Sequence, residues 1–204
     1  MLNVALFGQM ASGKSSIAAG LVDTGYVQLA FAQPLKNISE LAYGKIDKAG
    51  SYRITTLHGD EITISGREVL QRVGQSIKSH DRDFWLKCFL GVCENYGTNH
   101  LVVDDGRFEF ERDALKERGW LIAGIRTPES VRRERYIITY GREPTEVELS
   151  HPSEVELPLI VENADLILDG TADPYYNVRR IQQACEGRGA STIFRQTSLV
   201  RDVV

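Results

Sequence analysis

Residues 8–15 read Gly-Gln-Met-Ala-Ser-Gly-Lys-Ser, which matches the pattern G-x-x-x-x-G-K-S/T and limits the fold more than any other feature of the sequence. The preceding residues 3–7 are apolar and β-prone, and residues 15–22 suit a helix. In a strand, loop and helix of this kind, backbone N–H groups and the positive end of the helix dipole face an anion. A plain glycine turn is the weaker alternative, so the pattern predicts a nucleoside triphosphate site.

Two side chains of this loop have specific expected roles. Lys14 is expected to reach the β- and γ-phosphates of ATP, and the Ser15 hydroxyl is expected to bind Mg²⁺. The expected ATP-binding residues of this segment are Gly8, Ala11, Ser12, Gly13, Lys14, Ser15 and Ser16.

The composition excludes several classes of protein. A length of 204 residues suits one α/β domain, 1–204, with a substantial core. The net charge of −4 argues against nucleic acid as a stable partner, because no polycationic surface is available to displace counterions. The three cysteines and four histidines lack disulfide or metal spacing. Neither a signal peptide nor an apolar run of about 18 residues is present, so we expect no membrane segment and a cytoplasmic location.

Five short apolar runs predict strands that are buried on both faces, as in a mainly parallel sheet. They lie at residues 3–7, 26–31, 100–103, 120–125 and 165–168. Helical segments separate them, and this alternation predicts a three-layer α/β/α P-loop NTPase fold. We expect the last residues, from about Gly187, to form a weakly ordered tail or an added edge strand.

Residues 32–99 are an insertion much longer than one crossover requires. Alternating segments at 52–57 and 61–65 predict a β-hairpin, and helical patterns lie on either side of it. Such an inserted subdomain offers a platform for a second, acceptor substrate.

Residues 127–157 have the composition of a lid that closes on phosphates. Thr127 is a candidate N-cap, with Pro128 at the first helical position, and the helix that follows carries arginines and breaks at Gly141. Arg132 and Arg135 are three residues apart and share a face, from which they could stabilise the transferring phosphoryl group. A solvated charged face is the alternative.

The predicted strand at 100–103 ends in Asp104-Asp105-Gly106-Arg107. A carboxylate at a strand end beside a phosphate loop is typical of an acid that binds Mg²⁺. Arg107 lies just beyond, where open α/β sheets bind ligands. A plain Asp-Asp-Gly turn is the alternative, and the choice between Asp104 and Asp105 stays open because adjacent strand residues point to opposite faces.

Two side chains at the start of a predicted helix in the insertion are candidates for the acceptor. Arg67 could grip a monophosphate, and Gln71, one turn later, could reach a base or a phosphate. A solvated arginine is the commoner interpretation. Phe84 and Trp85 could stack on a base, although their helical spacing favours core packing for both.

Several segments follow one another in a characteristic order. They are Phe31-Ala32-Gln33-Pro34-Leu35-Lys36, the stretch 66–74, the aromatic pair 84–85, Asp105-Gly106-Arg107-Phe108 with Glu111, His151-Pro152-Ser153-Glu154, and the stretch 165–171. From the phosphate loop to about Gln182 the chain thereby resembles the deoxynucleoside monophosphate kinases of large DNA phages, within the P-loop nucleoside monophosphate kinase group. It departs from their pattern at Gly106, where a β-branched residue is usual, and at Leu168, where asparagine is common.

The resemblance implies that Lys36, Arg67 and Arg107 hold an acceptor monophosphate, and Gln71 and Trp85 complete the expected site. It also favours Asp105 over Asp104 as the acid. Gly170 and Thr171 are implied to lie near the adenine of ATP.

The expected activity is ATP- and Mg²⁺-dependent phosphorylation of deoxynucleoside monophosphates to diphosphates. The expected catalytic residues are Lys14, Arg107, Arg132 and Arg135, with Mg²⁺ on Ser15 and Asp105 or Asp104. Partners are small-molecule nucleotides, a homodimer is left open, and the location is the host-cell cytoplasm if the chain is phage-encoded. The alternatives are a small-molecule kinase similar to dephospho-coenzyme A kinase, with Asp105 positioning a hydroxyl acceptor, and a nucleotide-dependent ATPase switch.

Overall fold

The structure is a computed structural model that describes residues 2–47, 50–55, 58–97 and 100–199, with side chains described as far as Gly187. It divides into two compact units. Met1–Leu29 with Thr98–Val204 form the first, here called the phosphate-loop unit. Ala30–Gly97 form the second, the insertion unit, which spans nearly the same residues as the predicted insertion.

The phosphate-loop unit is built on a five-stranded parallel sheet. In spatial order its strands are β2 (Val27–Leu29), β5 (Leu101–Val103), β1 (Val4–Phe7), β6 (Leu121–Arg126) and β7 (Leu166–Asp169). Val4 of the central strand lies opposite both Val102 and Leu121. Every residue of β1 and β5 is buried, as expected of strands covered on both faces. All five predicted strands are therefore present.

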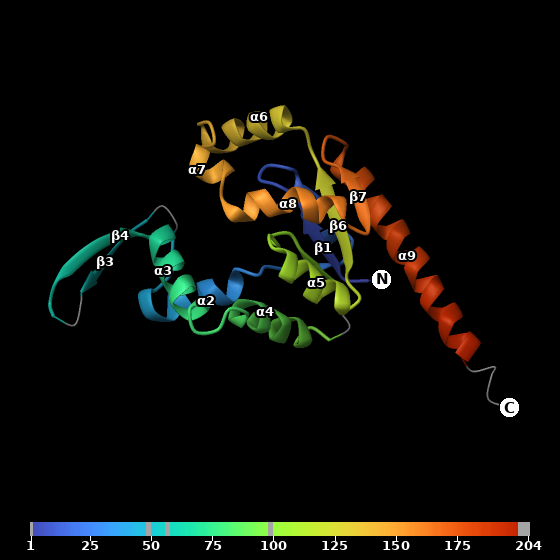
Figure 1. The fold of residues 1–204 in the computed structure, drawn as a ribbon, viewed down its shortest axis with the longest axis horizontal. Coiled ribbons are helices and arrows are strands. Elements are labelled where there is room, and N and C mark those ends of the chain that lie inside the picture. Colours follow the sequence, from blue (N-terminus) through green and yellow to red (C-terminus); the bar gives the residue numbers. More distant parts are fainter. Residues whose placement is uncertain (1, 48–49, 56–57, 98–99, 200–204) are drawn as a thin grey trace. The chain divides into compact units, whose positions relative to one another are not determined.

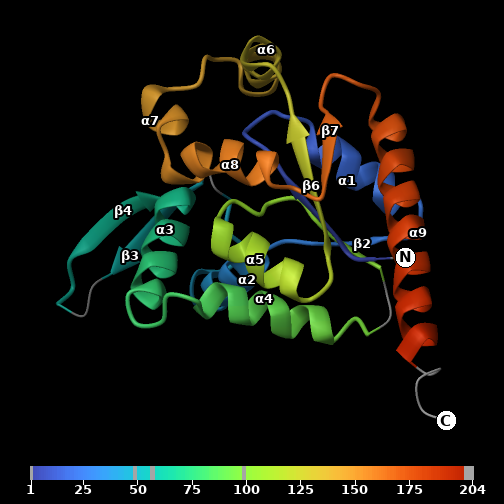
Figure 2. The same ribbon diagram turned by 45° about the vertical axis from the view of Figure 1, so that its right-hand side comes forward.

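Helices cover both faces of this sheet (Figures 1 and 2). On one face α1 (Lys14–Val22) packs against α9 (Pro174–Leu199). On the other face α5 (Glu109–Glu117) and α8 (Pro152–Glu162) pack against β6 and each other. The predicted three-layer α/β/α fold is confirmed. No helix in the described part of the chain is both long enough and apolar enough to span a bilayer.

The C-terminal segment differs from its prediction. The backbone of α9 continues as a helix to Leu199, where a weakly ordered tail or an edge strand was expected from Gly187. A glycine costs a helix about 1 kcal/mol relative to alanine. An established helix nevertheless gains one hydrogen bond for each residue added, and no proline interrupts this one.

The predicted lid contains more helix than the sequence pattern indicated. After α6 (Glu129–Tyr140), which ends at Gly141 with φ of +69°, come α7 (Glu146–Leu149) and then α8. Thr145 and Glu148 form a reciprocal capping box at the start of α7, and the His151 side chain accepts the Ser153 N–H at the start of α8. These local caps turn a proline-punctuated polar stretch into two helices.

Helix α6 begins one residue later than predicted. Pro128, expected at the first helical position, occupies the N-cap. Thr127, expected to cap the helix, instead donates a hydrogen bond from Oγ1 to Ser12 O at 2.9 Å. The Thr127 hydroxyl therefore helps to fix the backbone of the phosphate loop at Ser12.

The insertion unit contains three helices and a hairpin among its described residues. They are α2 (Gln33–Tyr43), β3 (Ser51–Thr55), β4 (Glu61–Ser65), α3 (Gly66–Lys78) and α4 (Phe84–Glu94). The strands β3 and β4 pair antiparallel, as predicted, with Tyr52 opposite Ile64. Residues 56–57 of the predicted hairpin lie outside the described residues. The rings of Phe31 and Phe89 lie 4.1 Å apart in this unit's interior.

Candidate active site

A cavity of about 680 Å³ lies over the phosphate loop, within the phosphate-loop unit. Residues 10–17 line it from the loop and the start of α1. The remaining lining residues are Asp104, Asp105 and Arg107 after β5, Arg135, Tyr136, Ile138, Thr139 and Tyr140 of α6, and Gly170, Ala172, Pro174 and Asn177 after β7. The cavity thus lies beyond the carboxyl ends of the strands, where open α/β sheets bind ligands.

The backbone of the loop has the conformation that its glycines permit. Gly13 has φ of +100°, and Ala11 has φ of +57°, which is unusual for a residue with a Cβ atom. A Cβ on Gly8 would lie 2.6 Å from Ser12 Oγ, so the loop also needs glycine there for close packing. Gly13 is the N-cap of α1 and supplies no side-chain cap. The first N–H groups of α1 are therefore suited to bind an anion.

Lys14 folds back over the loop that carries it. Its Nζ donates hydrogen bonds to Gly8 O at 2.5 Å and to Gln9 O at 2.9 Å. Burial lowers the pKa of Lys14 to about 8, Arg107 contributes to this effect, and the carboxylates of Glu154 and Asp104 oppose it. An ammonium held by carbonyl groups in this way can exchange them for the more strongly charged oxygens of a phosphate.

Ser15 is paired with Asp104 rather than with Asp105. The Ser15 hydroxyl donates to Asp104 Oδ2 at 2.8 Å, and the Gln28 side chain of β2 donates to Asp104 Oδ1 at 2.9 Å. Asp105 also lines the cavity. The resemblance favoured Asp105 as the acid beside Ser15, and the side-chain contacts place Asp104 there, because adjacent residues at a strand end point in different directions.

Arg107 is held at two points. Its backbone N–H donates to Glu111 Oε2 at 2.7 Å, and its guanidinium Nη1 donates to Glu154 Oε1 at 2.7 Å. Burial raises the pKa of Glu111 to about 7, although hydrogen bonds from the backbone of Arg107 and Phe108 act in the opposite direction. Arg107 lines the cavity, and the Glu111 and Glu154 carboxylates fix its backbone and its guanidinium.

The two lid arginines, Arg132 and Arg135, line different cavities. Arg135 lines the cavity, and its Nη1 would lie 3.4 Å from a Cβ placed on Gly13. Arg132 instead lines a smaller cavity of about 100 Å³ together with Gln9, and its Nε donates to Thr127 O at 3.3 Å. Of the pair predicted to share a phosphate-facing surface, only Arg135 borders the larger cavity.

Of the two residues expected near adenine, Gly170 and Thr171, one lines the cavity and the other does not. Gly170 lines the cavity, and a Cβ there would overlap Thr127 Oγ1 and Ser12 O, so the glycine lets β7 approach the phosphate loop. Thr171 does not line this cavity, and its hydroxyl donates to Asp169 Oδ1 at 2.7 Å. Asn177 lines the cavity in its place.

Asn177 of α9 was not anticipated from the sequence. Its Nδ2 donates to Asp169 O at 2.8 Å, which fixes the orientation of the amide. The side chain is 1 % exposed, and Oδ1 has no hydrogen-bond partner among the described residues. A buried acceptor of this kind at a cavity wall suits a hydrogen-bond donor of a ligand or a water molecule.

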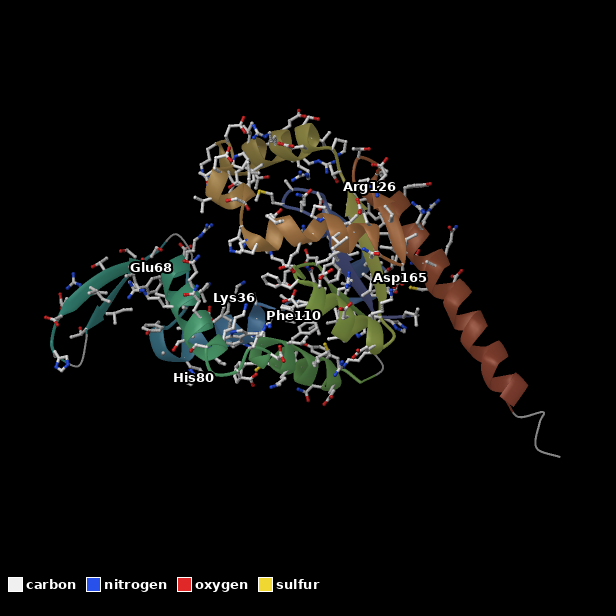
Figure 3. The ribbon with its side chains drawn as sticks, viewed as in Figure 1. Lys36, Glu68, His80, Phe110, Arg126 and Asp165 are labelled. Atoms are coloured by element: carbon white, nitrogen blue, oxygen red, sulfur yellow. The ribbon has the colours of Figure 1, made fainter. Side chains whose placement is uncertain are left out.

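The remaining predicted residues belong to the insertion unit. Lys36 is half-buried on α2, and Figure 3 labels it there. Arg67 and Gln71 are exposed on α3, four residues apart and therefore on one face. Trp85 is half-buried, with Nε1 donating to Gly74 O at 3.2 Å and its ring 5.0 Å from that of Phe84. Trp85 is therefore part of this unit's packing, which the helical spacing favoured.

Glu154, Gln28 and Asn177 are contacts of the site to which the residue patterns assigned no role. Glu154 stands in a segment that the resemblance covered, but nothing in its neighbourhood along the chain indicates a buried carboxylate. The partners of the Glu154 carboxylate are Arg107, 47 residues away, and Met10, 144 residues away. Only the fold brings such groups together.

Solved structures of kinases share this fold. A shikimate kinase from Aquifex aeolicus vf5 superposes with a TM-score of 0.60 at 17 % identity, over 92 % of this chain and 98 % of that one. A shikimate kinase from Acinetobacter baumannii in complex with shikimate has a TM-score of 0.52 at 16 % identity, over 92 % and 94 %. A gluconokinase from Sinorhizobium meliloti 1021 has a TM-score of 0.50 at 19 % identity, over 95 % and 96 %. The chain therefore has the fold of P-loop kinases. Its sequence matches no model of a known protein family and no curated protein.

Proposed function

We propose that the protein is an ATP- and Mg²⁺-dependent kinase that converts deoxynucleoside monophosphates to diphosphates. In this reaction the bond between the γ-phosphorus and the β–γ bridging oxygen of ATP breaks. A new bond forms between that phosphorus and an oxygen of the acceptor monophosphate, and ADP leaves. The observation that carries the phosphoryl-transfer part is the set of Lys14, Ser15, Arg107 and Arg135 around one cavity at the strand ends.

The donor side follows from the chemistry of these groups. The N–H groups at the start of α1 and the Lys14 ammonium suit the triphosphate of ATP. Arg135, from the lid helix, suits the charge that develops on the transferring group. Phosphoryl transfer requires mainly positioning and charge neutralisation, and a cavity lined by these cations can supply both.

The residues beside Lys14 also suit a magnesium ion. Mg²⁺ prefers oxygen ligands and is commonly held by one or two protein groups together with substrate phosphates. The Ser15 hydroxyl and the Asp104 carboxylate, whose oxygens lie 2.8 Å apart, are such a pair. When bound there with ATP, the ion would neutralise charge on the β- and γ-phosphates. Asp104 is accordingly the acid that we assign to the metal.

The acceptor side of the proposal rests on the resemblance and on charge. Arg107 lines the cavity, and the resemblance adds Lys36, Arg67 and, in the same helix, Gln71 from the insertion unit. Cationic groups of this kind suit a monophosphate dianion, and guanidinium groups can bind it in bidentate fashion. A monophosphate is already ionised at neutral pH, so this acceptor requires no general base.

A kinase with a hydroxyl acceptor is the second candidate. The names of the similar structures, shikimate kinase and gluconokinase, favour it, since those substrates carry hydroxyl groups. A hydroxyl acceptor needs a positioned carboxylate to take its proton, and Asp105 borders the cavity. For this case the candidate acceptors are dephospho-coenzyme A, shikimate and gluconate.

A panel of acceptors tests the proposal. Full-length protein with ATP and Mg²⁺ is given each common deoxyribo- and ribonucleoside monophosphate, dephospho-coenzyme A, shikimate or gluconate, and ADP release is followed in a coupled assay. Mass spectrometry of the product identifies the acceptor. We expect turnover of one or more deoxynucleoside monophosphates. Turnover of a hydroxyl acceptor alone would overturn the proposed substrate, and acceptor-independent ADP release would instead indicate an ATPase switch.

A further inference from the structure

Glu154 is a buried carboxylate that takes no direct part in the proposed phosphoryl transfer. It lies in the first turn of α8 and is 4 % exposed. It does not border the cavity over the phosphate loop. Burying a carboxylate is costly unless hydrogen bonds and a partner cation compensate the charge. The partners of Glu154 therefore indicate its role.

Both oxygens of Glu154 have a partner, and the two partners belong to different parts of the site. Oε2 accepts a hydrogen bond from the backbone N–H of Met10, in the phosphate loop, at 2.8 Å. Oε1 accepts one from Arg107 Nη1 at 2.7 Å. One carboxylate thus joins the phosphate loop, the segment after β5 and α8, all within the phosphate-loop unit.

The contact with Arg107 orients a group that faces the cavity. The Arg107 side chain is 41 % exposed and borders the cavity, whereas the Glu154 side chain is 4 % exposed and does not line it. A guanidinium group is planar and presents its N–H donors in a fixed fork, so a carboxylate bound to one nitrogen restricts the orientation of the whole group. The backbone of Arg107 is held separately by Glu111.

We propose that Glu154 is a positioning residue that holds the Arg107 guanidinium and the phosphate loop at Met10 in a fixed relation. The acceptor-binding arginine and the ATP site are then aligned by one buried carboxylate. This inference deepens the proposed function and rests on it. A displacement of about 1 Å at a reacting group can cost roughly 10²-fold in rate. We therefore expect loss of the Glu154 carboxylate to lower kcat more than it weakens ATP binding.

Glu154→Gln tests the link because the amide keeps the shape and removes the charge. Its oxygen can still accept the Met10 N–H, but its NH₂ group then opposes the N–H donors of Arg107. We expect kcat to fall by roughly tenfold to hundredfold while KM for ATP stays within about twofold. A kcat within about twofold of the wild type would overturn the proposal.

Glu156→Gln is the matched control. Glu156 lies on the same helix, and its carboxylate accepts the Glu109 N–H at 3.4 Å, outside the cavity lining. The same chemical change there reports the cost of losing a structural carboxylate. We expect its kcat to match the wild type, and an equal loss in both variants would show that the effect of Glu154→Gln is not specific to Arg107.

A double-mutant cycle asks whether Glu154 acts through Arg107. We expect Arg107→Gln to lower kcat, and Glu154→Gln is then added to that variant. If the carboxylate works by orienting the guanidinium, the second change has little further effect on kcat once the guanidinium is gone. An undiminished effect of Glu154→Gln in the Arg107→Gln background would overturn the proposed mechanism.

A substrate-free measurement separates this inference from the choice of acceptor. Hydrogen exchange of the Met10 amide is followed in the wild type, Glu154→Ala and Glu154→Gln. We expect exchange to accelerate by about tenfold or more in Glu154→Ala, since a charge-assisted hydrogen bond is lost, and by less in Glu154→Gln. Unchanged exchange in Glu154→Ala would overturn the link to the loop. If no monophosphate is phosphorylated, the proposed substrate fails, and kcat in the experiments above is measured on the acceptor that the panel identifies.

Discussion

Among the described residues, ion pairs with one buried partner are found in the phosphate-loop unit and not in the insertion unit. In the phosphate-loop unit, Arg107 pairs with a carboxylate that is 4 % exposed, at 2.7 Å. In the insertion unit, the ion pair Arg53–Glu61 spans 3.6 Å with both side chains more than half exposed, and Arg72–Glu68 joins two partly exposed groups one helical turn apart. Exposed pairs of this kind contribute little to stability, whereas breaking a buried pair leaves an uncompensated charge.

Binding groups that the fold already holds in place differ from binding groups that are exposed on a helix. Lys14, Ser15 and Arg107 have hydrogen-bond partners within the phosphate-loop unit before any nucleotide binds, so the fold sets their geometry. Arg67 and Gln71 are exposed on α3, the helix whose Glu68 is labelled in Figure 3. We therefore expect ATP and the acceptor group bound by Arg107 to meet preorganised side chains, and acceptor binding to order Arg67 and Gln71.

The largest effect is expected from the group that is most firmly held. Lys14→Ala removes the ammonium that lies over the loop, and we expect kcat to fall by about 10²–10³-fold, as for other preorganised electrostatic groups. The coupled ADP-release assay measures it. Lys45→Ala, at an exposed position of the insertion unit, serves as the control. A Lys14→Ala variant with near-normal kcat would show that Lys14 takes no part in phosphoryl transfer. The contrast between a preorganised phosphate loop and an exposed acceptor site would then fail.

The next effect distinguishes two neighbouring acids. We expect Asp104→Asn to raise the Mg²⁺ concentration needed for half-maximal rate by about tenfold to hundredfold, because Ser15 loses its carboxylate partner. Asp105→Asn is the matched comparison, one residue along the chain, and we expect a smaller change in metal requirement. The opposite order would assign the metal to Asp105, as the resemblance implied.

A smaller effect is expected in the insertion unit. Arg67→Ala should raise the acceptor KM by roughly tenfold, the lower end for a charge-assisted hydrogen bond, because the side chain is exposed. KM for ATP should stay unchanged. Arg72→Ala provides the control on the same helix, since that arginine is paired with Glu68. If both variants bind the acceptor as the wild type does, the assignment of Arg67 is wrong.

The last prediction concerns the pH dependence of stability and does not involve catalysis. The pKa of Glu111 is raised to about 7, so between about pH 4.5 and 7 the folded state binds more protons than the unfolded state. The free energy of unfolding should therefore fall as pH rises through this window, by at most about 1.4 kcal/mol per pH unit. Glu111→Gln should flatten that dependence in urea unfolding. Glu117→Gln, at an exposed position of the same helix, should leave it intact.

Local patterns predicted most of the elements. The apolar runs located all five strands of the sheet, and Gly141 marked the end of α6. The misses came where long-range contacts override local chemistry. Threonine is a common N-cap residue, but the Thr127 hydroxyl donates a hydrogen bond to Ser12 O, 115 residues away. Arg132 and Arg135 share a helical spacing, but Arg135 borders the cavity over the phosphate loop and Arg132 borders a smaller cavity with Gln9.

The sequence by itself determined the phosphate loop, because glycine spacing and backbone freedom act within eight residues. It also determined the alternation of buried strands and helices, which local periodicity encodes. Only the tertiary structure decided that Asp104 faces Ser15, that Asn177 borders the cavity and that Glu154 joins Arg107 to Met10. The Glu154 carboxylate accepts hydrogen bonds from a guanidinium 47 residues away and from a backbone N–H 144 residues away. No local pattern records them, because burial and direction are set only when the strands and helices pack.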